Sequence, residues 1–332
     1  MNRIGIIGGG AWGTALATVM RRAGRETVIW AREPEVVQAI NQRHENPIFL
    51  PGTNLDPGIH AVTDIALAVG VDAVLLVVPS QFVRATVAAF AAALAPDTPV
   101  VICAKGIERG TGRLMTEVVA EVLPEAPLAV LSGPTFAAEV ARGLPTAVTL
   151  ACGDEGLGHA LATAFGTRRF RPYVSDDPIG AEIGGAVKNV LAIACGVVAG
   201  REFGDSARAA LITRGLAEMA RLGAAKGAKP ETMMGLSGLG DLALTCNGPQ
   251  SRNMSLGIAL GRGKALSDIL AARRSVAEGV VSSISVTDLA ASLGVEMPIS
   301  AAVRAILHAG ADIDSVIEGL LSRPFKDEWP GA

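Results

Sequence analysis

Lys188 is the residue whose surroundings point most directly to chemistry. It lies in the apolar stretch 183–193, which contains no other charged side chain. At helical spacing it shares a face with Gly184 and Gly185, whose missing side chains leave room for a bulky group to approach. A buried lysine loses its hydration, a cost that only an anionic partner or ligand offsets. We therefore predict a functional role for Lys188, in preference to a lysine that simply extends into water.

A second lysine, Lys105, follows the apolar run Val100–Ala104 and precedes Gly106. Ligands of open α/β sheets bind beyond the carboxyl ends of the strands, so a lysine at this position would face the ligand. A lysine at a strand end that only reaches water fits the segment equally well.

Polar residues between positions 241 and 253 form a pattern suited to a phosphate. Asp241 closes the otherwise apolar, glycine-rich segment 237–241, a predicted loop in which a turn or helix-capping aspartate is the ordinary alternative. Further on, Ser251, Arg252 and Asn253 stand at a predicted helix start. Arginine binds phosphate through paired hydrogen bonds, and a helix N-terminus adds backbone N–H groups. The cluster predicts a phosphate site, and a capping role for Ser251 is compatible with it.

Gly8, Gly10 and Gly13 form a G-x-G-x-x-G pattern between the apolar run Ile4–Ile7 and a predicted helix. In this context the first glycine permits a tight turn, the second lets the backbone approach a pyrophosphate, and the third lets helix and strand pack closely. The helix N-terminus then offers unpaired N–H groups to the anion. The pattern predicts a dinucleotide-binding loop, and a purely structural glycine turn is the weaker alternative.

The end of the next predicted strand bears on which dinucleotide binds. An acidic residue about 20 positions after the glycines usually binds the ribose 2′-hydroxyl of NAD. Here Arg32 comes first, which suits a 2′-phosphate, and Glu33 follows it. The pair favours NADP and leaves the use of NAD open, with two solvated charges at a strand end as the alternative.

An alternation of strands and helices positions these residues up to about residue 175. Continuous apolar runs predict strands covered on both faces, and the alternation is typical of βαβ units in a mostly parallel sheet. The predicted strands are Ile4–Ile7, Thr27–Ala31, Ala73–Val78, Val100–Ala104, Leu128–Leu131 and Ala147–Ala151. The predicted helices are Trp12–Arg22, Pro34–Arg43, Gln81–Leu94, Leu114–Leu123 and Glu155–Phe165.

After residue 177 the strand runs vanish and only helical stretches follow, each punctuated by Gly, Pro or Asn. The predicted helices are Ile179–Ala199, Ser206–Lys226, Arg252–Gly261, Ser267–Ala272, Val280–Leu293, Ile299–His308 and Ile313–Leu320. We therefore expect a dinucleotide-binding domain over residues 1–177, an all-helical substrate and catalytic domain over 178–325, and a loose tail over 326–332.

Composition excludes several classes of protein. The chain has 332 residues, 50% of them hydrophobic, and a net charge of −3. This is enough apolar material for a sizeable core, and the charge argues against a nucleic-acid partner while leaving small anions open. The four cysteines show no C-x-x-C pattern, which is typical of free thiols in a reducing cytosol. We expect no metal site and assign the four histidines no catalytic role.

The N-terminus imitates a secretion signal, because Arg3 precedes the uncharged stretch 4–20. Five glycines in that stretch argue instead for a strand and a glycine loop. No run reaches the roughly 18 apolar residues that a membrane span needs. We expect a soluble, cytoplasmic protein.

Taken together, the motifs resemble those of the bacterial-type NAD(P)-dependent glycerol-3-phosphate dehydrogenases. They occur in the family's order at residues 8–16, 103–108, 131–140, 185–189, 236–246, 251–253 and 276–280. The resemblance implies an α/β Rossmann-type N-terminal domain and an all-α C-terminal domain like that of 6-phosphogluconate dehydrogenase. It also implies reduction of dihydroxyacetone phosphate to sn-glycerol 3-phosphate for phospholipid synthesis, with NADP(H) or NAD(H).

The resemblance further assigns roles to residues. Lys188 would be the general acid and base, and Lys105 would contact both substrate and cofactor. The implied substrate-binding residues are Lys105, Gly133, Thr135, Lys188, Asp241, Ser251, Arg252 and Asn253. The implied cofactor-binding residues are Gly8, Gly10, Ala11, Trp12, Gly13, Arg32, Lys105, Ala137, Arg252, Val276 and Glu278.

Two positions depart from the family's pattern. Ala11 stands where many members have serine, so a side-chain contact is lost while the backbone N–H remains. Glu33 stands where some members have a second basic residue, which weakens the expectation of strict NADP use. Two other functions fit the motifs less well: a two-domain dehydrogenase of a carboxylate such as a 3-hydroxy acid or ketopantoate, and a sensor that binds NAD(H) without turnover. A homodimer is compatible with the apolar helical domain.

Overall fold

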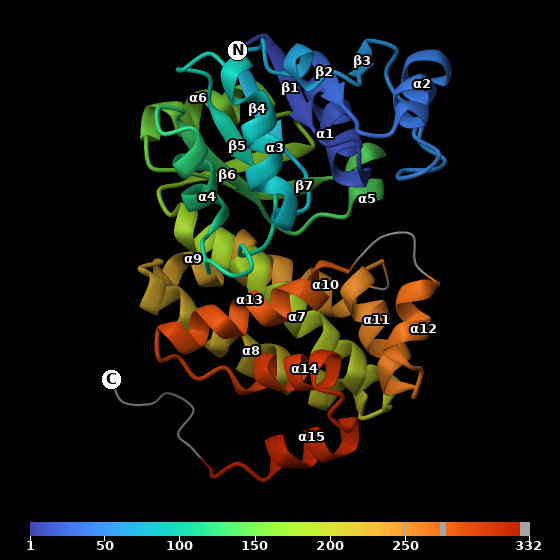
Figure 1. Ribbon diagram of the computed structural model, residues 1–332, viewed down its shortest axis with the longest axis vertical. Helices are drawn as coiled ribbons and strands as arrows, with labels where there is room; N and C mark the ends of the chain where they lie inside the picture. Colours follow the sequence, from blue (N-terminus) through green and yellow to red (C-terminus); the bar gives the residue numbers. More distant parts are fainter. Residues whose placement is uncertain (249, 273–276, 326–332) are drawn as a thin grey trace.

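The computed structural model describes residues 1–248, 250–272 and 277–325. Within these residues the chain forms two lobes, one built around a sheet and the other built of helices (Figure 1). The N-terminus lies on the sheet lobe, and the chain enters the helical lobe through α7 (Pro178–Gly200). Val276 and the predicted tail 326–332 lie outside the described residues.

One sheet of eight strands forms the centre of the first lobe. The strands are β1 (Arg3–Ile7), β2 (Glu26–Trp30), β3 (Ile59–Val62), β4 (Ala73–Leu76), β5 (Val100–Ile102), β6 (Leu128–Ser132), β7 (Thr146–Cys152) and β8 (Phe170–Ser175). Their order is β3-β2-β1-β4-β5-β6-β7-β8, and every neighbouring pair is parallel except β6 and β7, which are antiparallel. The predicted α/β class with a mostly parallel sheet is confirmed.

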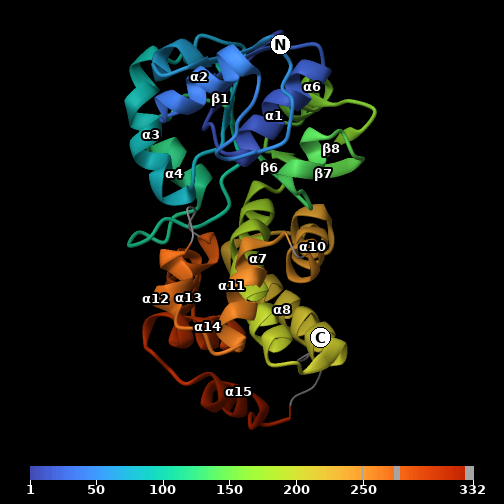
Figure 2. The same cartoon turned by 90° about the vertical axis from the view of Figure 1, so that its right-hand side faces the viewer.

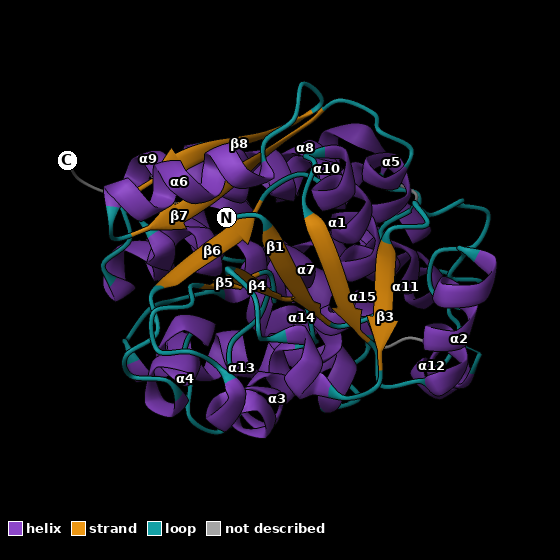
Figure 3. Ribbon diagram, turned by 90° about the horizontal axis from the view of Figure 1, so that it is seen from above, coloured by secondary structure: helices purple, strands orange, loops and turns teal. Residues whose placement is uncertain are grey.

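Helices cover both faces of this sheet (Figure 3). They are α1 (Ala11–Arg22), α2 (Pro34–Arg43), α3 (Val83–Phe90), α4 (Met115–Val122), α5 (Ala137–Ala141) and α6 (Glu155–Phe165), with short 3-10 turns η1 (Ile65–Ala68), η2 (Ser80–Phe82) and η3 (Ala91–Ala93). Leu16 of α1 and Phe165 of α6 pack on one face, and Val87 of α3 and Val118 of α4 pack on the other. The central strands are apolar throughout because both of their faces are covered.

The second lobe is entirely helical. After α7 it contains α8 (Gly204–Lys226), α9 (Pro230–Met234), the π-helical turn η4 (Leu236–Gly240), α10 (Asp241–Asn247), α11 (Arg252–Gly261), α12 (Leu266–Ala271), α13 (Glu278–Ser292), α14 (Pro298–His308) and α15 (Ile313–Leu321). Helix α7 runs through its centre and contacts α8, α10, α11, α13 and α14 (Figure 2). The predicted all-α C-terminal region is confirmed.

Helix α7 is long and apolar enough to cross a membrane, yet 78% of its most apolar window is buried inside the fold. Glycines let a neighbouring helix approach it closely. A Cβ atom at Gly196 would lie 2.3 Å from the Met254 carbonyl oxygen, and one at Gly257 would lie 2.1 Å from the Ile193 carbonyl oxygen. The apolar surface of α7 is therefore buried by packing against other helices of this lobe.

Several elements differ from the sequence prediction. Strands β3 and β8 were not predicted. Strand β3 carries the exposed His60, and the edge strand β8 has one buried residue, Phe170, and contains Pro172. The predicted helix 81–94 is divided among η2, α3 and η3. The predicted loop 237–241 is wrong: it forms the turn η4 and the start of α10.

Candidate active site

The centre of the site is one buried carboxylate between two lysines. Asp241 has no exposed surface, and its Oδ2 accepts a hydrogen bond of 2.6 Å from Lys105 Nζ. Its Oδ1 pairs with Lys188 Nζ, which also donates to Thr245 Oγ1 at 3.1 Å. Lys105 follows β5, Lys188 lies on α7, and Asp241 begins α10, so both lobes contribute. The three charges sum to +1, which favours an anionic ligand.

Two glycines of α7 explain how these groups come together. A Cβ atom at Gly184 would lie 2.3 Å from the Ser237 carbonyl oxygen, so only glycine lets η4 reach α7. A Cβ atom at Gly185 would lie 3.2 Å from Lys105 Cγ and 3.3 Å from Ser132 Oγ. The bulky groups that approach these glycines are therefore the η4 backbone and the Lys105 side chain.

The electrostatics of the site make proton transfer accessible near neutral pH. Burial lowers the pKa of Lys188 to about 8, and the Lys105 charge adds to this effect, while Asp241 opposes both. Burial alone would raise the pKa of Asp241, but the two lysine charges outweigh it and hold that pKa below its ordinary value. Lys188 can thus exist in either protonation state close to pH 8, as a general acid or base requires.

The loop after β6 supports Lys105 from the other side. The Gly133 carbonyl oxygen accepts a hydrogen bond of 3.1 Å from Lys105 Nζ, and Gly133 has a φ of +147°, which favours glycine. Thr135 Oγ1 donates to the same carbonyl at 3.4 Å, and Ala137 begins α5. The buried Ser132 Oγ has no hydrogen-bond partner among the described residues. A polar ligand beside Lys105 would satisfy it.

A second group of polar residues gathers at the N-termini of α11 and α13. Ser251 Oγ caps α11 by accepting from the Met254 N–H at 3.2 Å. Asn253 donates to Asn189 Oδ1 at 2.9 Å and accepts from the Gly279 N–H at 3.0 Å, so it joins α7, α11 and α13.

Arg252 is the first residue of α11, and Glu278 is the first of α13. Burial raises the pKa of Glu278, and the Arg252 charge opposes that rise. The guanidinium therefore lies close enough to influence Glu278, at the helix N-terminus where an anion would bind.

The glycine loop fits a dinucleotide. Gly8 has a φ of +129°, and a Cβ atom there would lie 2.9 Å from the Val77 backbone. A Cβ atom at Gly13 would lie 1.9 Å from the Gly8 carbonyl oxygen, whereas one at Gly10 would meet nothing within 4 Å. The open space is thus at the glycine that precedes α1, a helix without a side-chain cap, and the Trp12 Nε1 donor beside it has no partner among the described residues. These N–H groups suit a pyrophosphate.

Arg32 lies at the surface just after β2. Its side chain is 78% exposed, and its guanidinium makes an ion pair of 2.8 Å with Glu33, the residue before α2. Ala11, the first residue of α1, is a partly buried residue that packs against the hydrophobic core of this lobe. Arg32 is therefore a solvent-exposed residue beyond the end of β2, paired with its neighbour Glu33.

The prediction from sequence missed two polar residues of the site. Thr245 touches both Lys188 and Asp241, and Asn189 supports Asn253. Thr245 lies one helical turn after Asp241, so helical spacing would have identified it had a helix been predicted there. Asn189 adjoins Lys188 in the sequence, and that proximity is the signal that could have identified it. Among the described residues no group of three or more His, Cys, Asp or Glu side chains is placed to hold a metal.

Family models and curated relatives both relate this chain to one family of dehydrogenases. The N-terminal and C-terminal models of the NAD-dependent glycerol-3-phosphate dehydrogenase family match residues 3–157 and 177–318. A glycerol-3-phosphate dehydrogenase (NAD(P)+) of Rhodospirillum rubrum is 61% identical over 329 residues, covering 99% of this chain and 94% of that protein. One from Parvibaculum lavamentivorans is 60% identical over 326 residues, covering 98% of each chain.

A solved structure agrees with these relatives. The crystal structure of glycerol-3-phosphate dehydrogenase from Coxiella burnetii superposes with a TM-score of 0.93 at 40% identity, covering 97% of this chain and 99% of that one. The match therefore extends through both lobes and includes every segment that contributes to the site. The chain belongs to the NAD-dependent glycerol-3-phosphate dehydrogenase family.

Proposed function

We propose that this protein reduces dihydroxyacetone phosphate to sn-glycerol 3-phosphate, reversibly, with NADPH or NADH. The observation that carries the proposal is the buried Lys188, paired with Asp241 beside Lys105. It combines a proton donor with a pKa of about 8 and a local charge of +1. Family membership supports the same reaction, since the relatives are named for it.

In this proposal the two parts of the chain divide the work. Residues 1–177 provide most of the dinucleotide contacts, and residues 178–325 supply Lys188 and most of the substrate site. Gly8, Gly10, Ala11, Trp12 and Gly13 would hold the pyrophosphate through backbone and indole N–H groups. The other proposed cofactor contacts are Arg32, Lys105, Ala137, Arg252, Val276 and Glu278.

A reduced nicotinamide, when bound, supplies the hydride that reduces the ketone. Protonated Lys188 stabilises the negative charge that develops on the ketone oxygen and donates the proton to it. In the reverse direction neutral Lys188 accepts that proton. Lys105 adds a second positive charge at the same oxygen, and Asp241 holds both ammonium groups in position.

Arg252 and the N-terminus of α11 anchor the substrate phosphate away from the reacting carbon. Such remote binding energy orients the ketone for reaction. Asn253 holds α11 against α7 and α13, so it fixes Arg252 relative to Lys188. Gly133, Thr135 and Ser251 complete the proposed substrate contacts.

Oxidation of NADPH by the purified protein tests the proposal, with and without dihydroxyacetone phosphate and with NADH in parallel. Oxidation that depends on this substrate would support it. Turnover with a carboxylate such as ketopantoate instead would replace the substrate, and cofactor binding without any turnover would identify a sensor. The ratio of the rates with NADPH and NADH shows which cofactor Arg32 and Glu33 favour.

We further propose that the protein acts in the cytoplasm, where its product supplies glycerophospholipid synthesis. The proposal is supported by the free, buried cysteines and by an apolar α7 that is buried within the helical lobe. A homodimer is proposed as the assembly, and light scattering of the purified protein tests it. A mass of one chain at micromolar concentration would contradict a stable dimer.

A further inference from the structure

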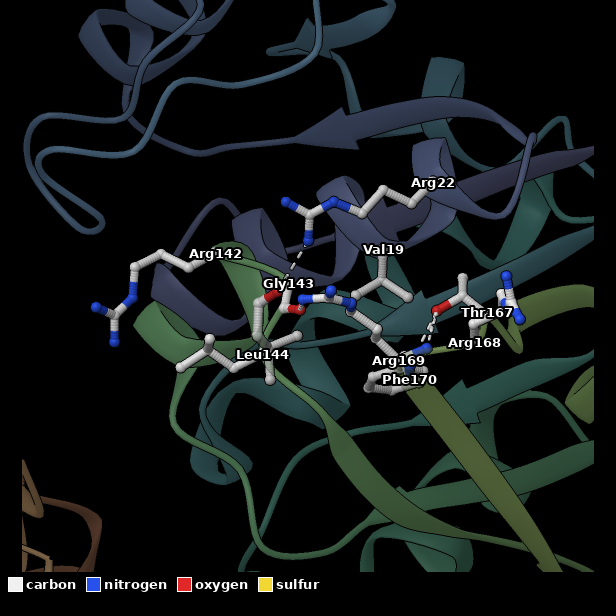
Figure 4. Close-up of a pocket in the computed structure, with 10 residues that line it drawn as sticks. Val19, Arg22, Arg142, Gly143, Leu144, Thr167, Arg168, Arg169 and Phe170 are labelled. Carbon is white, nitrogen blue, oxygen red and sulfur yellow. Dashed lines mark hydrogen bonds between the residues drawn. The ribbon is translucent and has the colours of Figure 1, made fainter.

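A cavity of about 430 Å³ lies on the sheet lobe, separate from the site described above (Figure 4). The C-terminal end of α1, the segment that follows α5 and the segment that leads into β8 line it. Val19, Leu144 and Phe170 provide apolar walls. Four arginines also line it, and none of its lining residues is acidic.

Two of these arginines lie close to each other. Figure 4 shows the guanidinium groups of Arg22 and Arg169 over the same part of the cavity, whereas those of Arg142 and Arg168 extend to opposite sides. Burial lowers the pKa of Arg22, and repulsion from Arg169 lowers it further. Both side chains are exposed to solvent, so water screens much of the repulsion between them. The lining offers them no carboxylate, and an anion between them would gain from both charges.

Backbone contacts account for only part of this arrangement. Arg22 donates to the carbonyl oxygens of Val140 at 3.0 Å and Ala141 at 2.5 Å, at the end of α5. Arg169 donates to the Gly143 carbonyl oxygen at 3.1 Å. Each guanidinium carries five N–H donors, so these three bonds leave donors for a ligand. Capping of α5 explains Arg22, but it does not require a second arginine beside it.

We propose that this cavity is a second ligand site, for a small phosphate monoester with an apolar part. Its phosphate receives N–H groups from Arg22 and Arg169, and its apolar part packs against Val19, Leu144 and Phe170. Arginine pairs suit a phosphate because their planar groups can each donate two hydrogen bonds to it. The cavity lies within the range of volumes that small-molecule sites have.

Ligand in this cavity would also affect the dinucleotide site. Helices α1 and α5 both end at the cavity, and both begin at residues with a proposed cofactor role, Gly10 before α1 and Ala137 in α5. The 12 residues of α1 span about 18 Å between the two sites. This coupling rests on the proposed cofactor site, whereas binding in the cavity does not.

Calorimetric titration of the whole protein with hexyl phosphate tests the proposal. Four proteins are compared: wild type, Arg169→Gln, Arg171→Gln and Arg252→Ala. Arg171 is the matched control, because it is an exposed arginine on β8 that does not line the cavity. We expect Arg169→Gln to weaken one binding event about tenfold, as loss of a charge-assisted hydrogen bond does. Arg171→Gln should leave the same Kd within twofold.

The Arg252→Ala protein separates the cavity from the proposed substrate site. The binding event that depends on Arg169 should persist in it. Inorganic phosphate should bind this site more weakly than hexyl phosphate, because it lacks the apolar part. Equal binding by wild type and Arg169→Gln, or no binding that survives Arg252→Ala, would overturn the proposal.

A second variant and a second readout complete the test. Arg22→Gln should weaken the same event, and Arg169→Gln alone suffices if loss of the α5 contacts unfolds that protein. Bound hexyl phosphate should change the Kd for NADPH in wild type and not in Arg169→Gln. An unchanged Kd for NADPH would refute the coupling. None of these measurements involves turnover, so failure of the proposed reaction would be seen separately.

Discussion

Replacing Asp241 with asparagine tests how the site controls its proton. The substitution keeps the size of the buried side chain and removes its charge. Asp241 is bonded to both Lys105 and Lys188, and its charge opposes the burial and the lysine repulsion that lower the pKa of Lys188. Without that charge two ammonium groups share a buried site, so the pKa of Lys188 should fall further below its value of about 8.

The size of the effect follows from the charge interaction. Two unit charges about 4 Å apart interact by about 4 kcal/mol at an effective dielectric constant of 20. If the amide dipole and water replace half of this, about 2 kcal/mol remains, which corresponds to roughly 1.5 pKa units. The pKa of Lys188 would then move from about 8 to roughly 6.5. At pH 8 the protonated fraction falls from about one half to about 0.03, a loss of roughly fifteenfold in the reductive rate.

The assay is the pH profile of kcat for NADPH oxidation with saturating dihydroxyacetone phosphate. The wild-type rate should decline through about pH 8, and the Asp241→Asn rate through about 6.5, with recovery at pH 5.5. Thr245→Val is the matched control, because it removes a hydrogen bond of Lys188 without removing a charge. A rate that is reduced equally at every pH, with the inflection unchanged, would refute the assigned electrostatic role.

Four further predictions concern single residues. Lys188→Ala should abolish turnover while NADPH still binds, as fluorescence titration would show, and near-wild-type turnover would end its role as the acid. Arg252→Ala should raise the KM for dihydroxyacetone phosphate by roughly ten- to hundredfold, the cost of a charge-assisted contact, and an unchanged KM would move the phosphate site elsewhere. Glu33→Gln should free Arg32 from its ion pair and raise the ratio of kcat/KM for NADPH over NADH, and a constant ratio would contradict that role. Burial raises the pKa of Glu182 to about 7, so the folded state holds a proton between pH 4.5 and 7 that the unfolded state releases, and stability falls as pH rises through this window. The free energy of unfolding of Glu182→Gln minus that of wild type should therefore increase by roughly 2–3 kcal/mol as the pH rises from 5 to 8. Urea denaturation at each pH measures this difference, and a difference that does not change with pH would contradict the assignment.

The central sheet was predictable because its strands are covered on both faces. Burial on both sides demands continuous apolar runs, such as Val100–Ile102, and these are visible without a structure. Strands at the edge of the sheet need not be continuously apolar, so their sequence pattern is weaker. Phe170–Ser175 pairs with a neighbour along one edge only and has a single buried residue, so it contains no apolar run that a sequence search could detect.

The candidate site was predictable in its residue types but not in its pairing. The position of Lys188 in an apolar helix indicates that it needs a polar or charged partner. Nothing in the sequence identifies Asp241 as that partner. Asp241 was predicted in a loop because the segment 237–241 is glycine-rich. Gly184 lets the Ser237 backbone of this turn lie against α7, and such contacts between distant segments are set by tertiary packing.

The ion pair between Lys105 and Asp241 has a consequence for how the chain acquires its function. The two residues are 136 positions apart and lie in different lobes. Domains generally fold as units, and contacts between residues far apart in sequence form slowly because the intervening chain must first be ordered. The lysine–carboxylate–lysine group therefore exists only after the two lobes have packed against each other. During synthesis, activity begins only once α10 has joined a sheet lobe that was made well before it.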